Sequence, residues 1–149
     1  MSDSSIALLA PADRSEWEAL WQGYLTFYET EVADEVSAAT FDRLVAGERM
    51  QGAIARDASG RAVGFVTWLW HPGTWSLRDH IYLEDLFVAP DVRGGGVGRA
   101  LIERVTAEAR SRGAGKVYWH TQTSNVPARR LYDSLATDTG YMHYEITVT

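Results

Sequence analysis

The feature that most constrains the fold is a glycine-rich turn between an apolar, strand-like segment and a helix-like segment. Three consecutive glycines, Gly94 to Gly96, follow Leu86-Phe87-Val88, and an apolar residue then recurs at every fourth position from Val97 to Ala109. A strand that turns through glycines into a helix can aim several backbone N–H groups, and the positive end of the helix dipole, at one anion. Arg93 and Arg99 add positive charge beside the turn. The segment therefore predicts a binding site for a pyrophosphate.

Two other families of nucleotide-binding loop are excluded by their residues. A Walker A loop has Lys and Ser or Thr after its last glycine, whereas Gly98 is followed by Arg99 and Ala100. A dinucleotide-binding fingerprint needs a further small residue where Leu101 stands, and an acidic residue about 20 positions later, where the chain has Tyr118-Trp119-His120. The pattern that remains is Arg-x-x-Gly-x-Gly.

Composition bounds the remaining possibilities. A chain of 149 residues predicts one compact domain over residues 1–149. The absence of cysteine excludes disulfides and thiol catalysis, and the net charge of −6 argues against nucleic acid as a partner. No segment approaches the roughly 20 apolar residues that cross a bilayer, so no membrane partner is expected. Since no export signal is evident at the N-terminus, we expect a cytoplasmic protein.

Periodicity and turn residues predict an α+β chain. We expect strands at residues 6–9, 50–56, 62–70, 80–88, 116–121 and 141–148, and helices at 13–28, from 37 or 40 to 47, at 97–111 and at 125–135. Asp13 is the expected N-cap of the first helix, with Glu16 as the returning carboxylate, and Ser37 or Thr40 is the expected cap of the second. Antiparallel strands come first, and a strand–helix–strand crossover late in the chain predicts one parallel pair.

Three motifs together resemble the GNAT superfamily of N-acetyltransferases. Arg93 to Gly98 resembles its acetyl-CoA pyrophosphate loop, Tyr82 to Val88 looks like its central strand, and Asn125-x-x-Ala128-x-x-Leu131-Tyr132 is similar to its second cofactor-side motif. The motifs span about a third of the chain. The resemblance implies a three-layer GNAT fold, with a mixed central sheet of six to seven strands and about four flanking helices.

The same resemblance implies that acetyl-CoA is the co-substrate. The backbone of the central strand would bind its pantetheine arm, the glycine-rich loop would bind its pyrophosphate, and Arg99 and Asn125 would lie close to it. The residues implied are Leu86, Phe87, Val88, Arg93, Gly94, Gly95, Gly96, Val97, Gly98, Arg99 and Asn125.

The resemblance also assigns the acid, while the base stays open. Tyr132 matches the tyrosine that commonly protonates the leaving thiolate in this superfamily. Side chains alternate along a strand, so Glu84 and Asp85 are expected on opposite faces, and we choose Glu84 as the base, acting directly or through a water. His71, His80 and His120 are the alternatives. No pair of histidines has ligand spacing, so no metal is expected.

The acceptor site would lie at the first two helices and their loop, by the same resemblance. That loop carries four carboxylates, Glu29, Glu31, Asp34 and Glu35, which are either simply solvated or receive a cationic amine between aromatic walls. We assign Tyr28, Glu29, Glu31 and Trp70 to the acceptor; Tyr24 and Trp75 are further candidate walls. The pattern Trp17-x-x-x-Trp21-x-x-Tyr24 looks like the branch with histone, polyamine and D-amino-acid acetyltransferases, so the acceptor is a small-molecule or peptide amine.

The C-terminal part departs from the common pattern. Many members have Tyr-x-x-x-Gly-aromatic, whereas seven residues separate Tyr132 from Gly140, and one strand is expected after it. A longer helix is the simple explanation, and a strand supplied by a second subunit, which makes a homodimer, is the other. Two further functions remain open: a non-catalytic acyl-CoA-binding sensor and a protein-interaction module.

Overall fold

A computed structural model describes residues 4–149, and the chain divides into two compact units, Met1–Tyr118 and Trp119–Thr149, each of which is described by itself. In chain order the elements are β1 (Ser5–Leu8), η1 (Pro11–Asp13), α1 (Arg14–Phe27), α2 (Asp34–Ala46), β2 (Met50–Arg56), β3 (Ala62–His71), β4 (His80–Val88), η2 (Pro90–Val92), α3 (Val97–Arg112), β5 (Lys116–Tyr118) and α4 (Val126–Leu135). The predicted α+β class is confirmed.

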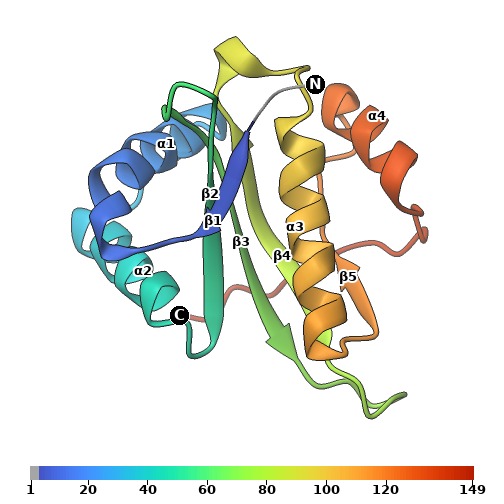
Figure 1. Cartoon of the computed structure of the whole chain (residues 1–149). Coiled ribbons are helices and arrows are strands. Elements are labelled where there is room, and N and C mark those ends of the chain that lie inside the picture. Colours follow the sequence, from blue (N-terminus) through green and yellow to red (C-terminus); the bar gives the residue numbers. More distant parts are fainter. Residues whose placement is uncertain (1–3) are drawn as a thin grey trace. The chain divides into compact units, whose positions relative to one another are not determined.

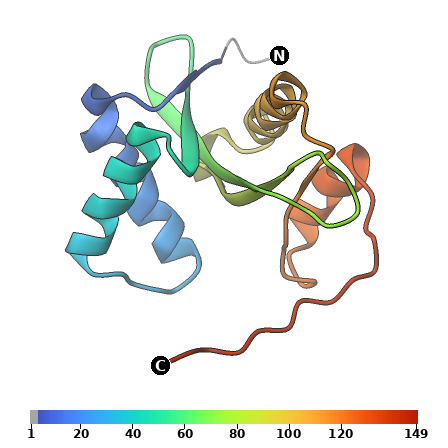
Figure 2. The same ribbon diagram turned by 90° about the horizontal axis from the view of Figure 1, so that it is seen from below.

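The first unit is a mixed sheet between two layers of helices. Its strands lie in the order β1-β2-β3-β4-β5, antiparallel except for the last pair, which is parallel. Helices α1 and α2 cover one face of the sheet and α3 covers the other (Figures 1 and 2). The parallel pair follows from the β4–α3–β5 crossover, because two strands that point the same way need a connection long enough to cross the sheet.

An aromatic cluster fills the space between α1, α2 and the sheet. Trp17 and Trp21 stack with ring centroids 5.2 Å apart, and both lie against Phe65 of β3, with centroids 6.1 Å away. Phe41 of α2 completes the contact with Trp17. Because α1 places an aromatic residue toward the sheet on successive turns, Trp17 and Trp21 are buried core residues.

Neither helix has the predicted side-chain capping hydrogen bond, because the side chains concerned have other partners. Asp13 is the N-cap residue of α1, as predicted, but its carboxylate makes no capping hydrogen bond, because it accepts from the Ala10 N–H and pairs with Arg56 at 2.7 Å. The Ser37 hydroxyl accepts from the buried Trp21 indole N–H at 2.9 Å. Helix α2 therefore begins earlier, at Asp34, with Ser37 inside it.

The sheet has five strands among the described residues, and the predicted count of six to seven is wrong. The expected last strand, residues 141–148, is not formed, and α4 ends at Leu135 without the expected extension. The apolar side chains of this segment are 76% to 90% exposed: Tyr141, Met142, Tyr144, Ile146 and Val148. These residues have a high β-propensity, but a strand forms only where a neighbouring strand provides partners for its backbone hydrogen bonds.

The α1–α2 loop begins with a strained residue. Glu29 has φ 54°, the single positive φ of a non-glycine residue in residues 4–149, and the bonds from the Glu29 N–H to Thr26 and from the Thr30 N–H to Leu25 close the helix end. Glycine normally occupies that position. We predict that Glu29→Gly raises the free energy of unfolding by about 1 kcal/mol, because it relieves the left-handed backbone. Thermal unfolding measures this gain. The matched variant Glu31→Gly removes the same charge and should give no gain; an equal gain would contradict the backbone explanation.

Candidate functional site

The glycine-rich turn forms an open cradle at the start of α3. Gly94 and Gly96 have φ values of 85° and 90°, as the sequence predicts for a turn that needs glycine, and Gly96 is the N-cap of α3. A Cβ built at either residue would meet nothing within 4 Å, so the space in front of the backbone is open. The first N–H groups of a helix have no carbonyl one turn earlier. The turn therefore fits a phosphate group that approaches the main chain closely.

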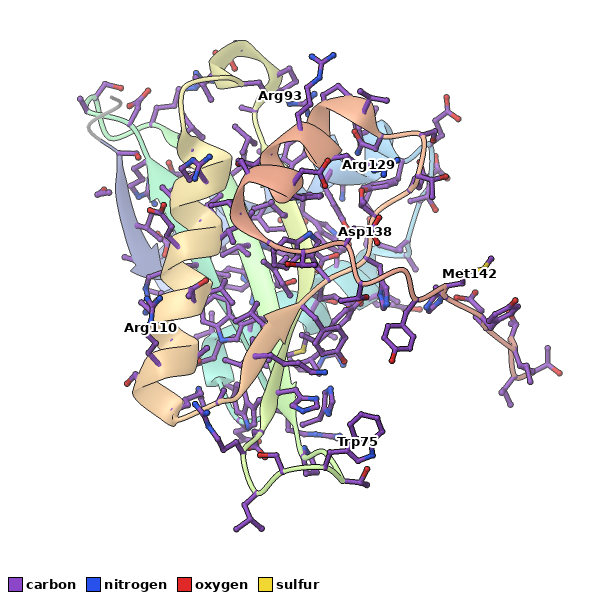
Figure 3. The ribbon with its side chains drawn as sticks, turned by 90° about the vertical axis from the view of Figure 1, so that its right-hand side faces the viewer. Trp75, Arg93, Arg110, Arg129, Asp138 and Met142 are labelled. Carbon is purple, nitrogen blue, oxygen red and sulfur yellow. The ribbon has the colours of Figure 1, made fainter. Side chains whose placement is uncertain are left out.

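Arg93 is held at the entrance of this turn. Its Nε donates a hydrogen bond to the Val88 carbonyl oxygen at 3.0 Å, and its guanidinium lies 5.2 Å from the ring centre of Phe27 and 5.6 Å from that of Phe87. Figure 3 shows Arg93 at the opposite end of the β3–β4 hairpin from Trp75, which is 97% exposed. These contacts fix a positive charge where the strand passes into the loop.

The edge of β4 that leads to the turn is open. Parallel pairing with β5 ends at Tyr82 and Tyr118, while β4 continues to Val88. Within residues 4–118, the stretch from Leu83 to Val88 therefore has no strand partner on that side. Unpaired backbone groups along a strand can bind an extended amide chain as a further strand would. The edge and the turn together fit the pantetheine arm and the pyrophosphate of acetyl-CoA.

A β-bulge places Glu84 and Asp85, and the expectation that they point to opposite faces is wrong. Thr67 of β3 lies opposite Asp85 and Trp68 lies opposite Leu83, so Glu84 is an extra residue in β4. The bulge interrupts the alternation of side chains. Burial raises the pKa of Tyr24 and of Tyr82, and the negative charges of both carboxylates add to the rise at each tyrosine.

Asp85 is fixed by two hydroxyl donors. The Tyr24 hydroxyl of α1 donates to one carboxylate oxygen at 2.7 Å, and Thr67 Oγ1 donates to the other at 2.5 Å. Burial raises the pKa of Asp85, while the two hydrogen bonds oppose that rise. With both oxygens engaged and the group largely enclosed, Asp85 is suited to hold a fixed position rather than to collect a proton from a substrate.

Glu84 has the properties of a proton acceptor. Its side chain is exposed, and partial loss of hydration, followed by the Asp85 charge, raises its pKa. A carboxylate whose pKa moves toward the working pH is a better general base. Nearby tyrosines stay neutral, since burial and the carboxylates raise the pKa of Tyr82 to about 12 and raise that of Tyr118.

The assigned acceptor residues are brought together in part. Tyr28, which is 42% exposed, packs edge-on against Tyr24 at 5.1 Å between ring centroids, and the exposed Glu29 and Glu31 follow it directly. Trp70 lies elsewhere: it shares the sheet face covered by α3, where the Arg112 guanidinium is 3.7 Å from its ring centre. The fold does not place Trp70 beside the other three.

Tyr132 and Asn125 belong to the second unit. Asn125 caps α4, its Oδ1 accepting from the Ala128 N–H at 3.3 Å, and the Tyr132 ring packs on Trp119 with centroids 5.3 Å apart. The same unit carries Arg129, whose guanidinium lies 4.0 Å from the Asp138 carboxylate (Figure 3). Their roles toward acetyl-CoA stay predictions.

Sequence reasoning missed two groups of contacts. It did not find Thr67 as a partner of Asp85, because no glycine or proline in β4 signals the bulge that sets their register. It also missed the hydrogen bond between His71 and Tyr118, which are 47 residues apart in the chain. Nothing local in the sequence indicates either pairing. Throughout residues 4–149, no cluster of three or more metal-ligating side chains is present, and no helix could span a membrane.

Comparison with known proteins agrees with this geometry. A family model described as acetyltransferase (GNAT) family matches residues 17–136. D-amino-acid N-acetyltransferase HPA3 of Saccharomyces cerevisiae is 35% identical over 142 residues, which cover 94% of this chain and 88% of HPA3. Thialysine N-epsilon-acetyltransferase of Bos taurus is 34% identical over 73 residues, 49% of this chain and 42% of that protein. The structure of AAC(6')-Iy in complex with a CoA bisubstrate analogue superposes with a TM-score of 0.87 at 19% identity, covering 99% of this chain and all of that one.

Proposed function

The chain belongs to the GNAT family of acetyltransferases, and on that premise we propose that it transfers the acetyl group of acetyl-CoA to the primary amine of a small cationic acceptor. The observation that carries the proposal is the open β4 edge, which runs directly into a glycine turn with two positive φ angles at the start of α3. Acetyl-CoA supplies the activated acyl group. The chain supplies its binding site, a base and a proton donor.

The chain must first deliver a neutral amine. An alkylamine with a pKa of about 10.4 is almost entirely protonated at neutral pH and has no lone pair for attack. Glu84 accepts this proton, directly or through a water. A backbone N–H on the β4 edge, among Leu86, Phe87 and Val88, faces the thioester oxygen and stabilises the charge that develops there. Tyr132 then protonates the sulfur.

The acceptor class rests on the charges of the α1–α2 loop. Four exposed carboxylates, Glu29, Glu31, Asp34 and Glu35, lie within seven residues that follow the Tyr24–Tyr28 ring pair. They attract cations, and the rings offer a cation–π surface. The named relatives HPA3 and thialysine acetyltransferase act on amino-acid amines, which fits a small acceptor for this chain.

We predict that replacing these four carboxylates by their amides raises the KM for a diamine severalfold. The reason is the loss of attraction for the second ammonium group, so the KM for a monoamine should rise less. The KM for acetyl-CoA should not change. Steady-state kinetics at low and high salt measure the effect, and an unchanged diamine KM at low salt would show that the loop is merely solvated.

The activity itself is tested with an amine panel and thiol release as the readout. Polyamines, amino acids of both hands, aminoglycosides and lysine peptides cover the acceptor classes. A thermal shift with acetyl-CoA distinguishes the alternatives, since a protein-interaction module would show no stabilisation. A sensor of the same fold would be stabilised and would acetylate no amine in the panel.

We also propose a cytoplasmic homodimer that uses the C-terminal segment. Met142, Tyr144, Ile146 and Val148 alternate with polar residues and are exposed, the pattern of a strand with one apolar face. Pairing with a second copy would satisfy the backbone and bury these side chains. Light scattering after size-exclusion chromatography, before and after truncation at Gly140, tests this assembly.

A further inference from the structure

A histidine and a tyrosine form a hydrogen-bonded couple where β3, β4 and β5 lie side by side. His71 Nε2 is 2.7 Å from the Tyr118 hydroxyl, and His71 Nδ1 is 2.8 Å from the Pro72 carbonyl oxygen. Both side chains are partly buried. Tyr118 ends the short parallel pair with Tyr82, and the rings of these two tyrosines lie 5.0 Å apart between centroids.

The two contacts of His71 determine where its proton lies. A carbonyl oxygen can only accept, so Nδ1 must donate to Pro72. In the neutral ring Nε2 then carries the lone pair, and the Tyr118 hydroxyl must donate to it. Tyr118 therefore directs its own proton at a histidine nitrogen, and a hydroxyl oxygen can accept a hydrogen bond while it donates one.

Tyr118 is also electrostatically linked to the base of the proposed reaction. The negative charge of Glu84 contributes, after burial, to the raised pKa of Tyr118. Glu84 follows Tyr82, the strand partner of Tyr118, by two residues and is the bulged residue of β4. The couple thus lies next to the point where β4 and β5 separate, on the side of Glu84.

We propose that Tyr118 and His71 carry the acceptor's proton away from Glu84 to solvent, an inference that rests on the proposed acetyltransferase function. The ammonium N–H bond breaks as Glu84 takes the proton, which leaves the amine with its lone pair. Glu84 returns to a carboxylate as its proton passes, directly or across a water, to the Tyr118 oxygen. The Tyr118 O–H bond breaks at the same time and its proton forms an N–H bond at His71 Nε2. The resulting imidazolium releases a proton to water, and all three groups are restored.

Other ionisable side chains lie beside this couple. His80 of β4 packs edge-on against His71 at 5.2 Å between centroids, and Lys116 of β5 lies 5.9 Å from the Tyr118 ring centre. Burial first, then Lys116 and His71, lower the pKa of His80, while Asp79 opposes that shift. The couple therefore has the ammonium group of Lys116 and a second imidazole, that of His80, beside it.

The test compares two acceptors in the same variants. His71→Gln can still accept the Tyr118 hydrogen bond but cannot take up the proton, and Tyr118→Phe keeps the ring but removes the relay oxygen. For an alkylamine at neutral pH we expect each variant to lose about 10²-fold in kcat/KM. The double variant should lose no more than either single one. For an alkoxyamine, which is already deprotonated at neutral pH, both variants should match the wild type.

Three results would overturn the relay. Equal losses with both acceptors would mean that His71 and Tyr118 have a structural role. Wild-type rates with the alkylamine would mean that the proton leaves elsewhere, and a loss that appears only in His80→Gln would assign the route to the neighbouring histidine. If the wild type acetylates neither acceptor, the proposed function itself fails. His143→Gln, in the exposed C-terminal segment, is the matched control.

Discussion

Tyr132→Phe should lower kcat by about 10²-fold or more while the affinity for acetyl-CoA stays unchanged. The proposed role of Tyr132 is to donate a proton to the departing thiolate, and phenylalanine has none to give. Its ring should keep the contact that Tyr132 makes with Trp119 inside the second unit, so α4 should be preserved. Single-turnover kinetics with saturating amine measure the chemical step, and calorimetry measures acetyl-CoA binding.

Tyr141→Phe is the matched control for this result. Tyr141 is 87% exposed in the segment after α4, so removal of its hydroxyl should leave kcat within twofold of the wild type. The two variants differ only in where a hydroxyl is lost. A Tyr132→Phe enzyme with wild-type kcat would remove the tyrosine from the mechanism, and one that lost acetyl-CoA affinity instead would make it a binding residue.

Gly96→Val should weaken acetyl-CoA binding by more than tenfold. Its φ of 90° is unfavourable for any residue with a Cβ, and a branched side chain would fill the open space in front of the α3 N-terminus. Backbone strain of about 1–3 kcal/mol should also lower stability. Binding and stability are therefore measured on the same variant, by calorimetry and by thermal unfolding without ligand.

Gly60→Val separates these two effects. Gly60 has φ 88° and, like Gly96, has nothing within 4 Å of a built Cβ, but it lies in the β2–β3 hairpin. It should lose similar stability and keep its acetyl-CoA affinity. If both variants lose affinity equally, strain alone explains the loss and the turn is not the pyrophosphate site.

Local signals explain why much of the first unit could be predicted. The predicted limits of β2 and β4 are the observed ones, since Met50–Arg56 and His80–Val88 are apolar runs that end at turn residues. The glycine turn was predicted equally well, because positive φ angles at Gly94 and Gly96 are a demand that only glycine meets without strain. These features depend on neighbours in sequence.

The predictions that the structure does not bear out all depend on contacts between residues that are distant in sequence. Asp13 stands at the N-cap of α1, yet its carboxylate pairs with Arg56, 43 residues away, and makes no capping hydrogen bond. Residues 141–148 had the composition of a strand but gained no strand partner. Trp70 was assigned to the acceptor site from its residue type. Side chains alternate between the two faces of β3, and this alternation places Trp70 on the face of α3, beside Arg112.

The sequence by itself determined the glycine-rich turn, the helix that follows it and the family, because each depends on residue types at fixed local spacing. Only the tertiary structure decided which groups surround Glu84, the proposed base. The register between β3 and β4 makes Glu84 the bulged residue and places Asp85 within hydrogen-bond distance of Tyr24 and Thr67. The end of β5 places Tyr118 within hydrogen-bond distance of His71. Strand register is set by the packing of whole faces, and no short stretch of sequence encodes it.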